Sequence, residues 1–134
     1  MNATGTTVTA FAPASVGNVG VGFDTLGHAL DFAGDRVRLT VTEEPEIRLD
    51  AITGLTTDLP SDTASNTALR ALTAIQKECG ISEGARLTLD KGIPLGSGMG
   101  GSAASAAAAV TAAAEAWGLA LSDQQRLRFA LEGE

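Results

Sequence analysis

The stretch that decides the fold is residues 94–105, which read PLGSGMGGSAAS. It follows an alternating segment that ends near Asp90 and precedes an alanine-rich segment that runs to Trp117. We therefore expect a strand, a glycine loop and a helix in succession. Glycines let a backbone approach a ligand closely, and the first turn of a helix offers unpaired N–H groups and the positive end of its dipole. The stretch predicts a binding site for an anion such as a phosphate.

Two widespread phosphate-binding motifs, the Walker A loop and the dinucleotide-binding fingerprint, match this loop only in part. A Walker A loop needs a lysine before its final serine or threonine, but Gly101 stands directly before Ser102, so we reject that motif. Gly96, Gly98 and Gly101 fit the letters of a dinucleotide fingerprint. The acidic residue at the expected distance, Asp123, lies at a predicted helix start instead of a strand end. The glycine pattern on its own is also compatible with a turn that binds nothing.

The rest of the chain predicts an α+β fold. Alternation of polar and apolar residues predicts strands over 6–11, 35–43, 46–52 and 86–90, and helical spacing predicts helices over 65–79, 102–117 and 122–134. Segment 12–24 is too rich in glycine for regular structure. Strands come first, followed by a helix, a strand and two helices, which predicts a mixed sheet with helices on one face.

Some details of the helices are also predicted. Ser122 and Gln125 have the spacing of a capping box at the start of the last helix. The apolar face of that helix is expected to comprise Leu127, Ala130 and Leu131. Cys79 falls on the apolar face of the first helix, where it is expected to be buried. Gly80 and Gly118 are expected to end the first and second helices.

The composition narrows the class of partner. A chain of 134 residues fits one domain, and its net charge of −7 disfavours nucleic acid and anionic membranes as partners. The longest apolar run is too short to span a bilayer, and the first residues lack the pattern of a signal peptide. A single cysteine excludes an internal disulfide. We expect a cytoplasmic protein that binds small molecules.

The glycine loop resembles the phosphate-binding motif of the GHMP kinases, the family of galactokinase and of homoserine, mevalonate and phosphomevalonate kinases. That motif runs proline, a short spacer and then Gly-Leu-Gly-Ser-Ser-Ala. Met99 takes the place of the leucine and Gly101 that of the first serine. The second substitution removes one hydroxyl group, whereas Ser102 keeps the other.

A second segment narrows the resemblance to one branch of the family. Residues 13–27 read PASVGNVGVGFDTLG, and they are similar to the homoserine kinase pattern Pro-Ala-Ser, then Asn-Leu-Gly-Pro-Gly-Phe-Asp-Thr-Leu-Gly. Val19 and Val21 take the places of the leucine and the proline. Mevalonate and galactose kinases instead carry a basic stretch that ends in Gly-Glu-His.

This resemblance implies a fold and an activity. The fold is that of the GHMP kinase amino-terminal domain (ribosomal protein S5 domain 2-like) over residues 1–134, truncated and without the carboxy-terminal domain. The activity is ATP- and Mg²⁺-dependent phosphorylation of L-homoserine to O-phospho-L-homoserine, a step of threonine biosynthesis, and a homodimer is compatible with it. The alternatives are another small-molecule kinase of the family and a nucleotide-binding fragment without turnover.

The resemblance also implies roles for individual residues. Asn18 would hydrogen-bond the reacting hydroxyl, and Asp24 would bind the ammonium group of the substrate. Mg²⁺ would be held by Ser102 and Glu134, with Glu132 as the rival carboxylate. Asn66 would lie near the adenine, although an ordinary helix-start role explains it equally well. The nucleotide phosphates would be bound by Pro94, Leu95, Gly96, Ser97, Gly98, Met99, Gly100, Gly101, Ser102, Ala103, Ala104 and Ser105.

Overall fold

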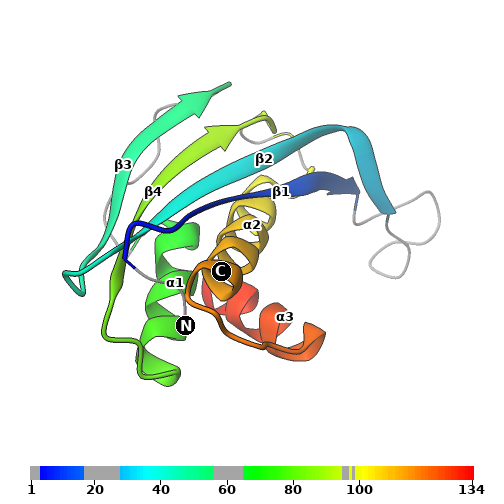
Figure 1. Ribbon diagram of the computed structural model, residues 1–134. Coiled ribbons are helices and arrows are strands. Elements are labelled where there is room, and N and C mark those ends of the chain that lie inside the picture. Colours follow the sequence, from blue (N-terminus) through cyan, green and yellow to red (C-terminus); the bar gives the residue numbers. More distant parts are fainter. Residues whose placement is uncertain (1–3, 17–27, 56–64, 95–96, 98) are drawn as a thin grey trace.

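The computed structural model describes residues 4–16, 28–55, 65–94, 97 and 99–134. Its strands are β1 (Thr7–Val16), β2 (His28–Thr42), β3 (Ile47–Gly54) and β4 (Gly84–Lys91), and its helices are α1 (Thr67–Glu78), α2 (Gly101–Ala116) and α3 (Asp123–Glu132). The strands form a sheet in the order β1-β2-β4-β3. β2 is antiparallel to both neighbours, whereas β3 and β4 are parallel. The sheet curves over all three helices (Figure 1), which confirms the predicted mixed sheet with helices on one face.

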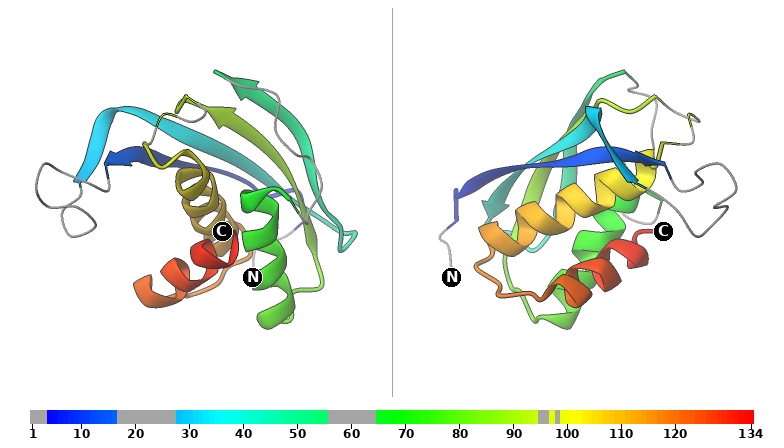
Figure 2. Two further views of the ribbon diagram at one scale, coloured as in Figure 1. Left: turned by 180° about the vertical axis from the view of Figure 1, so that it is seen from behind. Right: turned by 90° about the vertical axis from the view of Figure 1, so that its right-hand side faces the viewer.

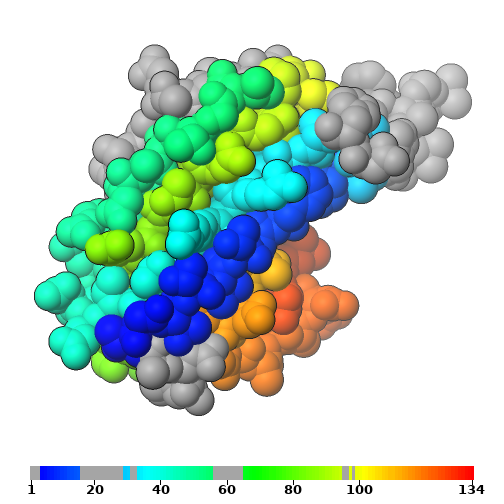
Figure 3. Space-filling model, turned by 45° about the horizontal axis from the view of Figure 1, so that its top comes forward, coloured from blue at the N-terminus to red at the C-terminus, as the bar shows by residue number. Residues whose placement is uncertain are grey.

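The register of the two inner strands explains where the core lies. Val37 pairs with Leu89 and Leu39 with Leu87, and all four side chains are buried against the helices. The intervening residues of these strands point to the opposite face, where the four strands lie side by side and open to solvent (Figure 3). The alternation predicted for β2 is therefore confirmed, and a one-residue slip would expose the whole apolar set.

Helix α2 occupies the centre of the helical layer. It packs on β1 and β2, with α1 beside it and α3 beneath it (Figure 2). Ten of its sixteen residues are buried, and most of them are alanines. A largely apolar helix is buried over most of its surface, and the small side chain of alanine lets it approach its neighbours closely. This packing fixes the position of the amino terminus of α2, where the glycine loop ends.

The strands at the amino end are longer than predicted. β1 continues through residues 12–16, which were expected to be irregular, and β2 begins at His28 instead of Asp35. Ala10, Ala12 and Ala14 are buried, so the inward alternation of the first strand continues with small side chains as far as Ala14. The two extensions pair with each other across an irregularity in the register between Pro13 and Ser15.

Two predicted burial patterns were wrong. The buried residue of α3 is Phe129, which is 1% exposed, whereas Leu127 and Leu131 are 62% and 61% exposed. Of the predicted face, only Ala130 packs partly buried against the core. The helix is rotated so that Phe129, a larger side chain than either leucine, enters the core. Cys79 is exposed because it is the C-cap of α1, with φ −89° and ψ 0°, and lies beyond the last helical residue.

The predicted ends of the helices are confirmed. Ser122 and Gln125 form both hydrogen bonds of the capping box. Gly80 and Gly118 adopt φ +64° and φ +68° just after α1 and α2, as C-terminal glycines do. Within the described ranges, no helix combines the length and the apolar character needed to cross a membrane.

An exposed ion pair joins α3 to α1. The guanidinium group of Arg128 donates to both carboxylate oxygens of Glu78, at 2.9 Å and 2.7 Å. These hydrogen bonds hold the pKa of Glu78 below its usual range. Both side chains are about half exposed, so the pair contributes little to stability.

Candidate functional site

The amino terminus of α2 is built differently from those of the other two helices. Gly100 is its N-cap in the left-handed conformation, at φ +72° and ψ 36°, and as a glycine it has no side chain to cap the helix. By contrast, Asn66 caps α1 and Ser122 caps α3 through their side-chain oxygens. The first N–H groups of α2 therefore lack the side-chain acceptor that the other helices possess, which suits this end to binding an anion.

The glycine loop contacts the end of the first strand. The backbone N–H of Ser15 donates to the carbonyl oxygen of Met99 at 2.9 Å. A Cβ atom on Gly100 would lie 2.6 Å from the hydroxyl oxygen of Ser15. Ser15 belongs to the segment 13–27 that carries the second sequence motif. The fold therefore brings the beginning of that motif against the glycine loop, although the two are far apart in the sequence.

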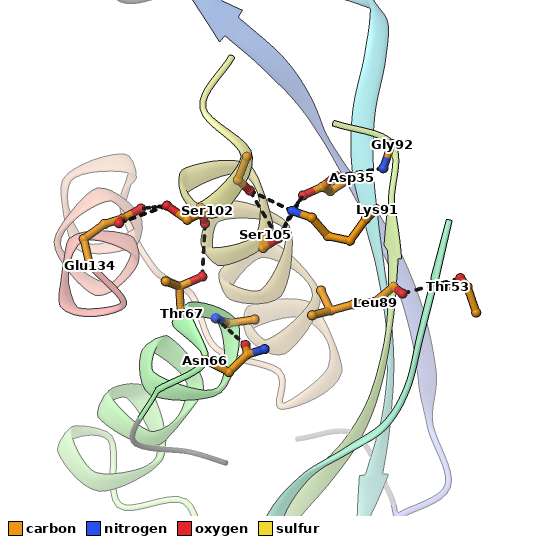
Figure 4. Close-up of polar contacts among 12 residues, drawn as sticks. Asp35, Thr53, Asn66, Thr67, Leu89, Lys91, Gly92, Ser102, Ser105 and Glu134 are labelled. Carbon is orange, nitrogen blue, oxygen red and sulfur yellow. Dashed lines mark hydrogen bonds and ion pairs between the residues drawn. The ribbon is translucent and has the colours of Figure 1, made fainter. Parts of the chain in front are cut away.

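A hydroxyl and a carboxylate meet at the start of α2. The side chain of Ser102 donates to both carboxylate oxygens of Glu134, at 2.9 Å and 3.1 Å (Figure 4). Thr67, the first residue of α1, donates through its hydroxyl to the carbonyl oxygen of Ser102 at 3.2 Å. The starts of α1 and α2 and the chain after α3 thus meet at one point. The rival carboxylate, Glu132, lies on the exposed side of α3.

Close packing at this junction depends on Gly133. A Cβ atom there would lie 2.5 Å from the carbonyl oxygen of Thr67 and 3.3 Å from the Cβ of Ala106. Residue 133 has an ordinary φ of −71°, so the need for glycine is one of space. The absence of a side chain allows Glu134 to reach Ser102.

The donor set at this junction is compatible with Mg²⁺. Mg²⁺ prefers oxygen ligands, and in phosphate-transfer sites it is held by one or two protein oxygens together with the phosphates. The hydroxyl of Ser102 and the carboxylate of Glu134 are such oxygens, and both side chains are exposed. They lie beside the helix end that is suited to phosphate. The structure thus brings together the two residues predicted to hold the metal.

Asn66 has a clear structural role. Its side-chain oxygen accepts hydrogen bonds from the backbone N–H groups of Ala68 and Leu69, at 3.0 Å and 3.3 Å, and the residue is buried. It follows that the helix-start interpretation is correct. A contact with adenine remains a prediction.

The remaining predicted site residues are distributed as follows. Within the loop, Ser97 and Pro94 are exposed and joined by a backbone hydrogen bond of 3.3 Å from the N–H of Ser97. Ala103 is exposed and Ala104 is buried in the first turn of α2. The residues that lie outside the described ranges are Asn18, Asp24, Leu95, Gly96 and Gly98.

A buried polar cluster below the loop was not predicted as such. One of its members, Ser105, was predicted to bind phosphate, but its side chain is buried and hydrogen-bonds Lys91 and Asp35. Asp35 on β2, Lys91 at the end of β4 and Ser105 on α2 are all buried, and the Lys91 ammonium forms an ion pair with the Asp35 carboxylate (Figure 4). A signal was present in the sequence. Alternation puts Asp35 on the same face as Val37, and Lys91 on the same face as Leu89, so both charges point toward the core.

Comparisons with known proteins show which family the chain resembles. The family model of the GHMP kinases N terminal domain matches residues 66–134, just over half of the chain. The homoserine kinase of Xylella fastidiosa (strain M12) is 46% identical over 125 residues, which cover 93% of this chain and 39% of that protein.

Solved structures show the same fold. The crystal structure of homoserine kinase from Cytophaga hutchinsonii superposes with a TM-score of 0.92 at 39% identity, over 100% of this chain and 42% of that chain. Mevalonate kinase of Methanococcus jannaschii superposes at a TM-score of 0.70 and 16% identity, over 97% of this chain and 46% of that chain, and shares the fold alone. The chain spans about two fifths of the length of the homoserine kinases that it resembles. It belongs to the GHMP kinase family, with the fold of the amino-terminal domain.

Proposed function

We propose that this chain is the nucleotide-binding domain of an ATP-dependent homoserine kinase, which transfers the γ-phosphoryl group of ATP to the hydroxyl of L-homoserine. The observation that carries the proposal is the Ser102–Glu134 pair beside the uncapped start of α2. The similarity to homoserine kinases over more than nine tenths of the chain supports the choice of substrate. The product would be O-phospho-L-homoserine, an intermediate of threonine biosynthesis, and a cytoplasmic location fits such a step.

Phosphoryl transfer depends on positioning and on neutralising charge more than on covalent chemistry. The N–H groups at the start of α2 would bind phosphate oxygens, and the absence of a side-chain cap leaves room for them. Ser102 and Glu134 would hold Mg²⁺, which supplies positive charge to the β- and γ-phosphate oxygens when it is bound. The exposed positions of both side chains allow a phosphate and a metal to approach together.

The amino-acid substrate would lie against segment 17–27, which follows β1. Asp24 would bind the ammonium group of homoserine, and Asn18 would hydrogen-bond the hydroxyl that attacks. The contact between Ser15 and Met99 supports this arrangement, because it brings the end of β1, which precedes that segment in the chain, to the phosphate loop. The substrate and the nucleotide would then meet where their two motifs meet.

The test is an ADP-release assay on the full-length protein with L-homoserine, mevalonate and galactose as separate substrates. We expect turnover with L-homoserine and much weaker turnover with the other two. Asp24→Asn should raise the KM for L-homoserine far more than the KM for ATP. Equal turnover of mevalonate would assign the protein to a different branch of the family and refute the proposal.

A second candidate is nucleotide binding without turnover by these 134 residues alone, favoured by their spanning about two fifths of the relatives' length. The amino-acid pocket would then have only the wall that carries Asn18 and Asp24. Misplacement of reacting groups by about 1 Å can reduce a rate roughly 10²-fold. We expect the isolated chain to bind ATP weakly and to release no ADP. Turnover comparable to that of the full-length protein would show that the pocket is complete.

A further inference from the structure

The buried cluster of Asp35, Lys91 and Ser105 connects three elements. Lys91 donates to the hydroxyl of Ser105 at 2.8 Å, and Ser105 donates to the carboxylate of Asp35 at 2.8 Å. With the Lys91–Asp35 ion pair, each of the three side chains contacts the other two. The cluster therefore ties β2, the end of β4 and the first turn of α2 together in the interior.

The same cluster holds both ends of the glycine loop. At the beginning of the loop, the N–H of Gly92 donates to the Asp35 carboxylate at 2.9 Å. At its end, the ammonium group of Lys91 donates to the carbonyl oxygen of Gly101 at 3.0 Å. Residues 92 and 101 enclose the loop, so one buried ion pair defines where the loop leaves the sheet and where it enters the helix.

The cost of burying these charges argues for a role beyond stability. Replacing a buried ion pair by apolar residues is often neutral or stabilising, whereas removing one partner leaves an unpaired buried charge. The surrounding positions on the same strand faces are apolar, as at Val37 and Leu89. An apolar pair would fill this part of the core equally well, but it would make no hydrogen bond to the ends of the loop.

We propose that Asp35, Lys91 and Ser105 are positioning residues that set the two ends of the phosphate loop. They are buried, so they act on the nucleotide through the backbone of residues 92 and 101 and do not touch it. The proposal rests on the proposed function, because it requires the loop to bind ATP. It predicts that a substitution in the cluster can disturb the placement of the loop without lowering the stability of the fold.

The experiment compares three variants of the full-length protein. Lys91→Met leaves a buried carboxylate without its partner and should lower the unfolding midpoint. Lys91→Met/Asp35→Asn removes both charges and keeps an acceptor for Gly92, so the midpoint should recover. The hydrogen bond to Gly101 stays lost in the double variant, so its affinity for Mg-ATP should remain about tenfold weaker than that of the native protein. Its KM for ATP should be about tenfold higher, while its KM for L-homoserine should change less than about twofold. Arg86→Met is the matched control, because Arg86 lies on the same strand as Lys91 and its loss breaks an exposed ion pair with Asp50 on β3. This variant should leave ATP affinity unchanged.

The outcomes separate the possible roles. Recovery of both the midpoint and ATP affinity in the double variant would overturn the proposal and leave the cluster a purely structural one. If the double variant does not fold, the Ser105→Ala variant tests the proposal instead, because it keeps the ion pair between Lys91 and Asp35. It should weaken ATP binding by about threefold in a protein that still folds, and unchanged binding would overturn the proposal. If the native protein does not bind ATP, the proposed function is refuted, and this inference is refuted with it.

Discussion

The hydroxyl of Ser102 donates to both carboxylate oxygens of Glu134, although 32 positions separate the two residues in the sequence. The first turn of α2 supplies the serine, and the chain just beyond α3 supplies the glutamate. A bond between them requires the three helices to converge at one point. The position of the carboxylate therefore depends on helix packing, which makes it sensitive to changes that touch neither residue.

Glu134→Gln should raise the Mg²⁺ concentration for half-maximal turnover at least about tenfold, because an amide oxygen binds Mg²⁺ much more weakly than a carboxylate oxygen. The unfolding midpoint should stay close to native, since residue 134 is exposed. The measurement is a magnesium titration of ADP release by the full-length protein. Glu132→Gln serves as the control. A larger effect of that control would transfer the metal role to Glu132.

Gly133→Ala should destabilise the fold by roughly 1–3 kcal/mol, the usual cost of overpacking a closely packed site. The added methyl group would meet the carbonyl oxygen of Thr67 at 2.5 Å, so α3 must move away from α1. Glu134 would move with it, and the magnesium requirement should rise as in Glu134→Gln. Denaturant unfolding and a magnesium titration test the two effects. A native unfolding curve would show that the junction can absorb the methyl group.

Gly100→Ala should weaken ATP binding and lower stability. Its φ of +72° costs a residue with a side chain about 1–2 kcal/mol, and the new Cβ would meet the Ser15 hydroxyl at 2.6 Å. Gly80→Ala is a matched control with φ +64° and no atom within 4 Å, so it carries the backbone penalty alone. ATP affinity measured by titration calorimetry should fall only in the first variant. An equal fall of ATP affinity in the two variants would show that the effect comes from a general loss of stability.

Glu78→Gln should make stability less dependent on pH in the acid range. The pKa of Glu78 is lowered by its hydrogen bond to Arg128, so the native pair stabilises the fold above the unfolded-state pKa. That contribution is lost as the pH falls through the lowered, folded-state pKa. Thermal unfolding of both proteins between neutral and acid pH measures the difference, which should be small because the pair is exposed. Parallel curves for the two proteins would contradict this prediction.

Much of the fold follows from local patterns in the sequence. The alternation in β2 and β4 has period two, and the capping residues of α3 act on their immediate neighbours, so both could be predicted without knowledge of the tertiary structure. The pairing of Ser102 with Glu134 came from the family resemblance. No local pattern indicates that the start of one helix meets the end of another.

The predictions made from the sequence were wrong where tertiary packing overrides the local pattern. Leu127 and Leu131 have helical spacing, but the larger ring of Phe129 fills the space that α1 and α2 leave. The Asp35–Lys91 pair depends on which strands become neighbours, since the two residues lie 56 positions apart. Strand neighbours are decided by the whole topology, and the sheet order β1-β2-β4-β3 is not the order of the chain.

That sheet order has a consequence for how the protein is made. β2 and β3 follow one another along the chain, yet β4 lies between them. A nascent chain that ends before Gly84 therefore carries β2 and β3 without the strand that lies between them, and unpaired strand edges promote aggregation. Synthesis of β4 closes the sheet at Lys91, and the phosphate loop leaves the ribosome immediately afterwards. A prematurely terminated product should accordingly be insoluble or quickly degraded, so that a soluble sheet without its nucleotide loop does not accumulate in the cell.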